Sequence, residues 1–409
     1  MERVVVTGLG VVTCAGNDVP SFWDAMCNGR SGIGRIASYD PTPFPTHIAG
    51  EVRDFQLEGR QVKHMARFAQ LAVGAAEEAL RHAGLCDGEG AYLHDPTRAG
   101  VLVGTGIGGE PFLEAQHAKF METGRKFHPL TVPIVIANMA SGNIAMRHKL
   151  CGPNMTLSTA CATGNHSIGT AADQIALGRA DVMVAGGAES TISAFAIQGY
   201  HLLTALSTRN DDPQGASRPF SAGRDGFVLA EGAGVLVLES ETHARARGAE
   251  ILAVLQGFGL SADAYHLTAP HPEGRGVAQA MREALRGAAL APGDIDYINA
   301  HGTSTPLNDA LETAAIREVF GPAADTVPVS SIKSMIGHSL GAASGIEAVA
   351  SVMALHSGVL PPTINLHEPD PELTLDYVPN TARQTNPRTV MSNSFAFGGQ
   401  NAVVIFTKP

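Results

Sequence analysis

Cysteine is scarce in this chain, which has five in 409 residues. The five positions are Cys14, Cys27, Cys86, Cys151 and Cys161. They form no CxxC pair and show no regular spacing, so a fold stabilised by disulfide bonds is not expected. An odd, scattered set of cysteines in a large chain is typical of a reducing compartment, where thiols stay free.

Basic runs and long apolar runs are also absent. The net charge is −11, which argues against a general nucleic-acid binder but permits a small local basic patch. No apolar run reaches membrane-spanning length, and the N-terminal segment MERVVVTGLG lacks the features of a signal peptide. The composition is globular, with 44% hydrophobic and 16% charged residues. We therefore expect a soluble cytoplasmic protein with no membrane or nucleic-acid partner.

The sequence does contain a recurring pattern of a short β-branched run, a glycine-rich turn and an alanine-rich helix. The expected strands are residues 3–8, 99–103, 155–159, 181–185, 235–239, 251–258, 295–300, 327–332, 390–394 and 402–406. The expected helices are residues 67–83, 164–177, 276–289 and 342–355. Such alternation predicts an α/β fold with a largely parallel sheet covered on both faces.

The pattern also suggests an internal duplication. Two strand–turn–helix units, 155–177 and 327–355, look alike, and the rhythm restarts after about residue 250. We therefore assign residues 1–250 to an N-terminal half and residues 251–409 to a C-terminal half. No low-complexity linker separates them, so we expect the halves to pack tightly.

Cys161 lies between an expected strand and the start of a helix rich in small residues. A thiol there meets the positive end of the helix dipole, which favours the thiolate, and small neighbours leave room for a substrate. The alternative interpretation is a buried structural cysteine, because cysteine often behaves as a small hydrophobe. The position by itself leaves both interpretations open.

Three further segments contain residue types that suit chemistry. His301 follows a strand end and precedes a glycine, which favours a place facing a cleft. Lys333 and His338 lie five residues apart in a turn that leads into a helix, where the ammonium tunes the local electrostatics. Glycines beside Phe397 suggest a mobile aromatic gate. Each segment also has a purely structural interpretation, such as a histidine whose hydrogen bonds are satisfied by neighbouring hydroxyls, or an ordinary glycine turn.

Two common motifs match in weaker contexts. Residues 104–109 fit the dinucleotide-binding pattern GxGxxG, but no second strand ends in an acidic residue at the right distance. Residues 337–341 fit the nucleophile elbow GxSxG, which makes a serine hydrolase using Ser339 the alternative function. That fold requires an acid and then a histidine downstream. Here the downstream aspartates follow both downstream histidines.

Taken together, these segments resemble the elongating β-ketoacyl-acyl-carrier-protein synthases, which have two catalytic histidines. The resemblance runs through essentially the whole chain and includes residues 6–10, 185–189, 205–209, 218–220, 224–227 and 360–365. It implies the thiolase fold, with five αβαβα layers in two duplicated halves, and a dimer. Degradative thiolases have a second catalytic cysteine near the C-terminus, whereas no cysteine follows Cys161.

The resemblance implies an acyltransferase that performs decarboxylative condensation of malonyl-acyl-carrier protein with an acyl group held on Cys161. His301 and His338 stabilise the enolate as carbon dioxide leaves. The backbone N–H groups of Cys161 and Phe397 form the oxyanion hole. Lys333 and Glu347 match the family's supporting charged pair.

Binding roles are also implied by the resemblance. Residues that match the pantetheine contacts are Thr303 and Thr305. Carrier proteins are acidic, and their expected docking residues are Lys63, Arg67, Arg125, Lys126 and Arg209. No cofactor is required, but a structural Na⁺ or K⁺ ion is expected at Asn299, Glu347, Ser392 and Asn393. The expected partners are acyl- and malonyl-loaded carrier protein, together with a second subunit that is either an identical chain or a chain-length-factor homologue.

Some positions depart from the family pattern. Ala396 stands in the gate where glycine is usual, and its methyl group restricts the backbone. The acyl-tunnel positions that the resemblance implies are Ile107, Glu110, Thr131, Tyr200 and His201. Most of these are more polar than a saturated chain prefers. We therefore hypothesise a specialised pathway, such as polyene or other type II polyketide extension, in place of housekeeping fatty-acid elongation.

Overall fold

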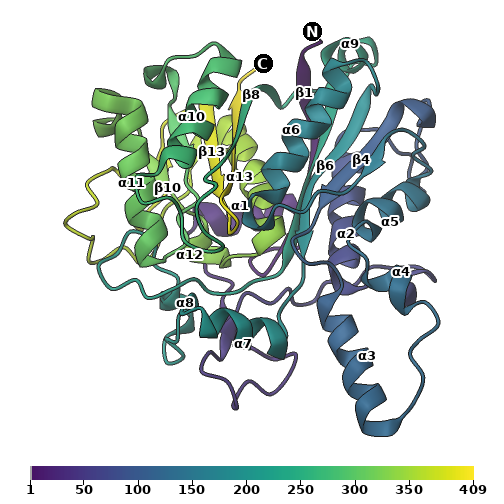
Figure 1. The fold of residues 1–409 in the computed structure, drawn as a ribbon. Coiled ribbons are helices and arrows are strands. Elements are labelled where there is room, and N and C mark those ends of the chain that lie inside the picture. Colours follow the sequence, from purple (N-terminus) through teal and green to yellow (C-terminus); the bar gives the residue numbers. More distant parts are fainter. Residues whose placement is uncertain (1) are drawn as a thin grey trace.

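Runs of valine, leucine, alanine and glycine form a ten-stranded sheet within residues 2–409, which are the residues that the computed structural model describes (Figure 1). Its order is β10-β9-β13-β14-β8-β1-β7-β6-β4-β5. The strands are β1 (Val4–Thr13), β4 (Ala99–Gly104), β5 (Asn154–Met155), β6 (Val182–Glu189), β7 (Gly232–Ser240), β8 (Ala253–Ala262), β9 (Tyr297–Asn299), β10 (Val329–Ser330), β13 (Thr389–Phe395) and β14 (Gln400–Thr407). Short pairs β2 (Gly34–Arg35) with β3 (Ile48–Ala49) and β11 (Val359–Leu360) with β12 (Arg383–Gln384) lie outside it.

The sheet order repeats in its two halves. In the first half, the strands numbered along the chain lie in the order third, second, fourth, fifth, first, which is β5-β4-β6-β7-β1. The second half has the same order as β10-β9-β13-β14-β8. The halves meet where β1 pairs antiparallel with β8. This repetition confirms the predicted duplication.

The sheet is mixed, so the prediction of a largely parallel sheet is wrong. Within residues 2–409, the parallel pairs of this sheet are β4 with β5 and β6, and β9 with β10 and β13. The other pairs are antiparallel. The last strand of each half, β7 or β14, runs antiparallel beside the strand that precedes it in sequence. The sequence does not predict this, because an apolar run does not reveal the direction of a strand.

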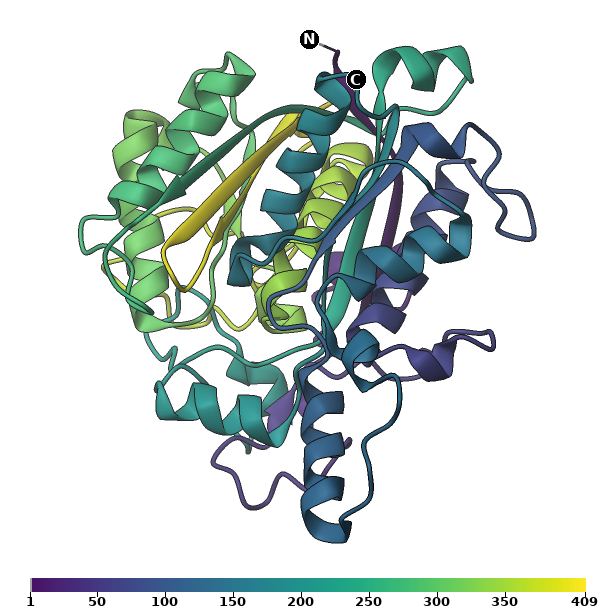
Figure 2. The same cartoon turned by 45° about the vertical axis from the view of Figure 1, so that its right-hand side comes forward.

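Helices cover both faces and fill the middle (Figures 1 and 2). Central helices α6 (Thr163–Ala176) and α13 (Ala343–Ser357) pack together between the two half-sheets, where apolar residues from both sides form one core. α2 (Arg67–His82) and α5 (Met139–His148) cover the outer face of the first half-sheet. α10 (Arg275–Ala288) and α11 (Pro306–Phe320) cover that of the second. The result is the five-layered αβαβα arrangement.

Several elements lie outside these layers. They are α3 (Glu110–Thr123), α4 (Thr131–Val135), α7 (Ala194–Leu202), α8 (Pro213–Ala216) and α9 (Glu241–Ala246). The helices α1 (Val19–Cys27) and α12 (Lys333–Ile336) instead pack into the core around α6 and α13. In Figure 1, α3 projects away from the layers together with the loop to α4, and α7 and α8 lie below the sheet. Among residues 2–409, no helix is long and apolar enough to span a membrane.

The predicted helices 67–83, 164–177, 276–289 and 342–355 are all present within one or two residues. Their Ala-rich faces give a clear 3.6-residue period. The predicted strand 155–159 is wrong beyond its first residue, because the chain leaves β5 after Met155 and turns toward Cys161. That departure brings the cysteine into the site described next.

Candidate active site

Cys161 lies in a 3-10 turn, Ala160–Ala162, directly before α6. Ala160 has a left-handed backbone (φ +46°), which is uncommon for a residue with a side chain. The Ser394 hydroxyl donates to the Cys161 carbonyl over 2.8 Å, so β13 of the second half fixes the turn. The strained turn therefore presents the thiol at the boundary between the two halves.

The Cys161 thiol faces His338. The His338 Nε2 atom lies 3.1 Å from Cys161 Sγ. Two backbone bonds to the neighbouring strand segment, His338 N–H to Val228 O at 2.7 Å and Ala230 N–H to His338 O at 3.0 Å, hold the histidine in place. Both Cys161 and His338 are buried. This is the spacing expected of a nucleophile and its proton acceptor.

Burial raises the pKa of the Cys161 thiol to about 11, although Lys333 and the backbone N–H groups of Phe397 and Cys161 lower it. Loss of solvent thus outweighs the local positive charge that favours the thiolate. The same N–H groups lie beside the sulfur, where a substrate oxygen would be placed after attack. A thiol that acts as a nucleophile must lose its proton, and His338 is the group within reach.

His301 lies just beyond the end of β9, opposite His338. The two imidazole rings are 5.5 Å apart and nearly perpendicular. The carboxylate of Glu312 accepts the N–H groups of His301 and Gly302, each over 2.8 Å, and so fixes this loop from α11. Burial, reinforced by Lys333, lowers the pKa of both catalytic-site histidines well below the usual value. The site therefore contains two neutral imidazoles.

Lys333 connects the parts of the site. Its Nζ donates to His301 O over 2.7 Å, lies 3.5 Å from His301 Nδ1 and forms an ion pair with Glu347 on α13. Lys333 and Glu347 are both buried, and burial raises the pKa of Glu347 to about 7, with Lys333 opposing that rise. The pair predicted from sequence is thus formed, with its charged ends inside the core.

One carboxylate oxygen of this pair belongs to a set of buried oxygen atoms that lack hydrogen-bond partners among the described residues. Within residues 2–409, no hydrogen-bond partner is found for Asn299 Oδ1, Glu347 Oε2, Ser392 Oγ or Asn393 Oδ1. Asn299 and Ser392 are register partners in β9 and β13, and Asn393 contacts Glu312. Buried oxygens without donors fit a hard cation. These are the four residues at which the sequence predicts a monovalent ion.

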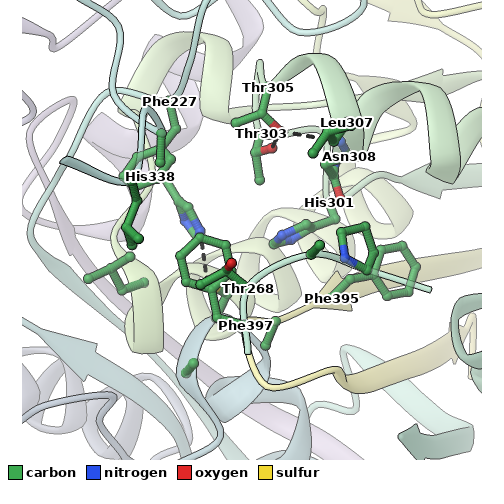
Figure 3. A pocket seen from close by; sticks show the side chains of 18 of the residues that line it. Phe227, Thr268, His301, Thr303, Thr305, Leu307, Asn308, His338, Phe395 and Phe397 are labelled. Atoms are coloured by element: carbon green, nitrogen blue, oxygen red, sulfur yellow. Dashed lines mark hydrogen bonds between the residues drawn. The ribbon is translucent and has the colours of Figure 1, made fainter. Parts of the chain in front are cut away.

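The histidines and Cys161 line a cavity of about 360 Å³ (Figure 3). Phe227, Phe395 and Phe397 supply aromatic walls, and Thr303 and Thr305 line another part of the cavity with their hydroxyls 2.9 Å apart. The gate residue Ala396 also lines it. Sites predicted for nucleophile, histidines, gate and pantetheine arm therefore share one cavity.

The predicted tunnel positions divide into two groups. Ile107 and Tyr200 line the cavity with Cys161. Glu110 lies beyond Ile107 at the start of α3, where Ser193 Oγ contacts its two carboxylate oxygens at 3.1 and 3.0 Å. Thr131, at the start of α4, and His201, in α7, are not among the residues that line the cavity.

The basic residues predicted to dock the carrier protein fall into an exposed group and an internally bonded group. Lys63, Arg125 and Lys126 are exposed, and the ring of His64 lies 6.1 Å from that of His128, so their segments are neighbours. Arg67 instead donates hydrogen bonds to the backbone carbonyls of Phe55 and Val52 and lies 4.0 Å from Glu231. Much of its hydrogen-bonding capacity is therefore used within the protein. Arg209 is half-buried and donates to Gly223 O over 3.1 Å.

Ser339 is not placed as a nucleophile, which argues against the hydrolase alternative. The residue is 1% exposed and is not among the residues that line the cavity. Its hydroxyl has no hydrogen-bond partner within residues 2–409, so no histidine activates it. The GxSxG match therefore arises from the glycine-rich turn that carries His338.

Sequence reasoning missed two buried carboxylates. Glu312 positions His301, as described above. Glu189 accepts from Thr105 Oγ1 at 2.8 Å and from the N–H groups of Gly106 at 2.6 Å and Gly341 at 3.2 Å. It therefore joins the loops from the two halves beside the cavity. Glu189 lies in the segment 185–189 that resembles the family, but nothing in that segment indicates its hydrogen bonds. Glu312 lies in no recognisable motif, because the residues that it bonds are ten and eleven positions away.

The fold and this cysteine–histidine–histidine centre define a condensing enzyme of the thiolase-fold class. Residues 1–244 match the family model for the beta-ketoacyl synthase N-terminal domain, and residues 252–367 match that for the C-terminal domain. The chain belongs to the beta-ketoacyl synthase family.

Similar proteins and solved structures support this family assignment. The 3-oxoacyl-[acyl-carrier-protein] synthase 2 of Coxiella burnetii is 47% identical over all of this chain and 99% of its own length. The ishigamide ketosynthase/chain length factor is 38% identical with a TM-score of 0.92, covering 100% of this chain and 99% of that one. AntDE:AntF, a type II PKS acyl-carrier protein in complex with its ketosynthase bound to the hexaketide, is 35% identical with a TM-score of 0.90 at the same coverage.

Proposed function

We propose that this protein catalyses chain elongation by condensing malonyl-acyl-carrier protein with an acyl group on Cys161. The observation that carries the proposal is the 3.1 Å approach of His338 Nε2 to Cys161 Sγ in a cavity that also contains His301. In this proposal, residues 1–250 form the half with the nucleophile and residues 251–409 the half with both histidines. Cytoplasmic location follows from the expected supply of carrier-bound substrates.

Acylation begins when the Cys161 sulfur attacks the thioester carbonyl of an acyl-carrier protein. The thiol proton passes to His338 Nε2 and from there to the departing carrier thiolate, so that His338 is neutral again. The N–H groups of Cys161 and Phe397 stabilise the oxyanion of the tetrahedral intermediate. Because the thiol pKa is about 11, proton transfer accompanies attack.

Condensation uses the two neutral histidines. The malonyl thioester oxygen accepts hydrogen bonds from His301 and His338, which stabilise the enolate as the carboxylate leaves as carbon dioxide. The enolate carbon then attacks the acyl carbonyl, and the carbon–sulfur bond to Cys161 breaks. Lys333 holds His301 in position, and the hydroxyls of Thr303 and Thr305 bind the pantetheine arm.

The cation cluster supports this arrangement. Burial and the nearby Glu312 raise the pKa of Glu347, whereas Lys333 pairs with Glu347, so one Na⁺ or K⁺ ion would balance the second buried carboxylate. Its ligands would be Asn299, Glu347, Ser392 and Asn393, and its role would be to stiffen the strands that carry His301 and the gate. Thermal unfolding in KCl and in choline chloride tests this. The wild-type midpoint should rise with K⁺, whereas that of Asn299→Ala should respond less.

We propose a second subunit on the exposed apolar side of α3, α4 and β5. Side chains there are Leu113, Phe120, Met121, Phe127, Leu130, Val132, Ile136 and Met155. β5 is also an open sheet edge, and such edges are normally paired or covered. The ishigamide ketosynthase is described with a chain length factor. Co-purification with a homologue that lacks the cysteine would distinguish a heterodimer from a homodimer.

For the acyl group, we propose an unsaturated or oxygenated chain of a specialised pathway. Glu110 and Ser193 place polar groups beyond the cavity, and Tyr200 adds a phenol to its wall. A saturated chain gains little from such groups. Similar turnover on saturated and unsaturated acyl-carrier substrates would contradict this assignment.

Intact-protein mass spectrometry tests the central proposal. The protein is incubated with acyl-carrier proteins of varied length and unsaturation, and wild type is compared with Cys161→Ala. We expect a mass increase equal to the acyl group in wild type and none in the variant. An adduct that survives in Cys161→Ala, or no adduct with any donor, would contradict it.

A further inference from the structure

A buried carboxylate that the proposed mechanism does not use lies beside the catalytic cavity. Glu189, the last residue of β6, is fully buried. Its Oε2 accepts the N–H of Gly106 over 2.6 Å and that of Gly341 over 3.2 Å. Its Oε1 accepts the Thr105 hydroxyl over 2.8 Å and the Ile107 N–H over 3.4 Å. All of these partners are donors, so the side chain serves as an acceptor, which suits an ionised carboxylate.

The donors come from both halves of the molecule. Residues 105–107 follow β4 in the first half, and Gly341 lies in the turn that precedes α13 in the second. The two loops touch, since a Cβ atom on Gly341 would lie 2.4 Å from Gly106 N. Glu189 therefore closes the contact between the loops by bonding backbone N–H groups from each.

Each of these loops supplies an apolar side chain to the catalytic cavity. Ile107 and Leu340 line the cavity together with Cys161. Ile107 is itself a donor to Glu189, and Leu340 directly precedes the donor Gly341. The carboxylate thus fixes the backbone beneath two apolar side chains, and these side chains help to set the space beside the nucleophile.

The loop after β4 is also bonded to the segment of the nucleophile. The Ser158 hydroxyl donates to Gly106 O over 2.9 Å, and Ser158 lies just before the turn that carries Cys161. The peptide groups on both sides of Gly106 are therefore bonded, one to Glu189 and the other to Ser158. Loss of the Glu189 bond would release this loop on one side only, so Ile107 would shift relative to Cys161.

The charge of Glu189 does not help the nucleophile. Burial raises the pKa of the Cys161 thiol to about 11, and the negative charge of Glu189 adds to the rise. A buried anion also loses its hydration on folding, which opposes its presence. Since the charge works against thiolate formation, the value of Glu189 to the site lies in its hydrogen bonds to the cavity loops.

We propose that Glu189 is a positioning residue that determines which acyl groups fit on Cys161, by holding Ile107 and Leu340 in place. This inference rests on the proposed function, because the acyl group enters this cavity only if Cys161 accepts it. With both side chains fixed, an acyl group of the wrong length or branching meets them. When the N–H groups lose their acceptor, the loops move apart and the cavity discriminates less.

The relative rates of different acyl donors test this role. Acyl-carrier proteins of varied chain length and branching are compared by kcat/KM for acylation of Cys161, measured by intact mass. The ratio between the best and the worst donor of wild type defines the selectivity. Glu189→Gln keeps the size of the side chain but turns an NH₂ group toward backbone N–H groups. We expect the selectivity to fall about 3- to 10-fold.

Decarboxylation of malonyl-carrier protein separates positioning from general damage. Backbone bonds with Val228 and Ala230 hold His338, so its place does not depend on Glu189. The kcat for decarboxylation by Glu189→Gln should therefore stay within about twofold of wild type. A merely structural role would lower acylation by all donors in the same proportion and leave the selectivity unchanged.

The matched control is Glu78→Gln. Glu78, on α2, also accepts two backbone N–H groups, from Val11 over 2.9 Å and from Val19 over 2.7 Å. Neither of these donors is among the residues that line the cavity, and neither adjoins one that does. The control should leave the selectivity unchanged, even where it lowers the midpoint of thermal unfolding.

A second pair of variants gives the answer if Glu189→Gln does not fold. The Thr105 hydroxyl donates to Glu189 and accepts the Gly108 N–H over 3.1 Å. Thr105→Val removes both bonds at nearly constant volume and should lower the selectivity about 2- to 3-fold. Thr105→Ser keeps the hydroxyl and should behave as wild type.

Three results would overturn the inference. They are unchanged selectivity in folded Glu189→Gln (or in Thr105→Val if the former does not fold), an equal loss of selectivity in Glu78→Gln, and a wild type without preference among donors. Failure of the proposed function gives a different result, because wild type would then form no Cys161 adduct with any donor.

Discussion

The two halves of the molecule place the same turn in two different settings. In the first half, the turn Ala160–Ala162 precedes α6, and in the second, the turn Leu340–Ala342 precedes α13. Ala160 and Leu340 have nearly identical left-handed backbones, with φ of +46° and +47°. The equivalent of Cys161 in this comparison is Gly341.

Packing explains the difference between these two positions. A Cβ atom on Gly341 would lie 2.4 Å from Gly106 N and 2.8 Å from Glu189 Oε2, so no side chain fits. Cys161 instead lines the cavity. The second half contributes through His338, which lies just before its turn. Duplication supplied the same scaffold twice, and local contacts decided which copy could hold a nucleophile.

The largest expected effect assigns Cys161 of the first half and His301 of the second half to different reaction steps. Cys161→Ala should abolish acylation but retain decarboxylation of malonyl-carrier protein, whereas His301→Ala should retain acylation and slow decarboxylation about 10²- to 10³-fold. The physical reason is that the proposed role of His301 is to stabilise the enolate, whereas His338 is the histidine that contacts the sulfur. Intact mass and carbon dioxide release measure the two steps. Loss of both steps in both variants would show that the halves do not divide the chemistry.

Some of this site could be predicted from the sequence. Cys161, His301 and His338 each lie in a short segment with glycine or small neighbours, and together they matched one family. The central helices α6 and α13 are rich in alanine and other apolar residues over a length typical of helices. Local patterns of this kind survive in a single sequence because they involve neighbouring residues.

Other features depend on long-range contacts and could not be predicted. Strand direction in the sheet is one, since an apolar run does not reveal its partner. The internal bonds of Arg67 are another, because a basic residue looks the same whether it faces a partner protein or a backbone carbonyl. The high thiol pKa of Cys161 depends on burial by segments from both halves.

Gly341→Ala tests the packing argument directly. The added methyl would meet Gly106 and Glu189, so we expect a loss of about 3 kcal/mol in the free energy of unfolding, measured by urea denaturation. Gly287→Ala in α10 is the control, because its Cβ would meet nothing nearer than Phe258 O at 3.5 Å. That variant should be neutral or more stable by up to about 1 kcal/mol. Equal stability of the two variants would refute the packing explanation.

A smaller effect is expected when a charge in the second half is removed and the reactivity of Cys161 in the first half is measured. The ammonium of Lys333, in the second half, lowers the pKa of Cys161 in the first. The double variant Lys333→Met/Glu347→Met removes both charges without leaving one buried alone. The thiol pKa should rise, so the thiolate fraction at a fixed pH falls, and alkylation by iodoacetamide should slow about 3- to 10-fold.

Exposed Cys151 is the internal reference for that experiment. Peptide mass spectrometry reports alkylation of both cysteines in one sample, and the rate at Cys151 should stay constant. An unchanged ratio between Cys161 and Cys151 would mean that Lys333 acts on the histidines alone. The two halves would then be electrostatically independent.

The smallest effect concerns the loops that follow the second strand of each half. The loop after β9 carries His301 and the proposed pantetheine-binding residues Thr303 and Thr305, whereas the loop after β4 leads to Glu110. Burial raises the pKa of Glu110 to about 7, although Ser193 lowers it. As pH rises through that value the carboxyl gains charge, so acylation by a saturated donor should fall about 2- to 5-fold relative to Glu110→Gln.

The comparison with Glu110→Gln isolates this one group. Glu347 also titrates near neutral pH, but it is present in both proteins, so its contribution cancels in the wild-type-to-variant ratio. Decarboxylation of malonyl-carrier protein should show no such change in ratio, because it depends on the loop after β9. If the ratio for decarboxylation changed with pH as the ratio for acylation does, Glu110 would act on the whole cavity. The two loops would then not serve separate parts of the substrate path.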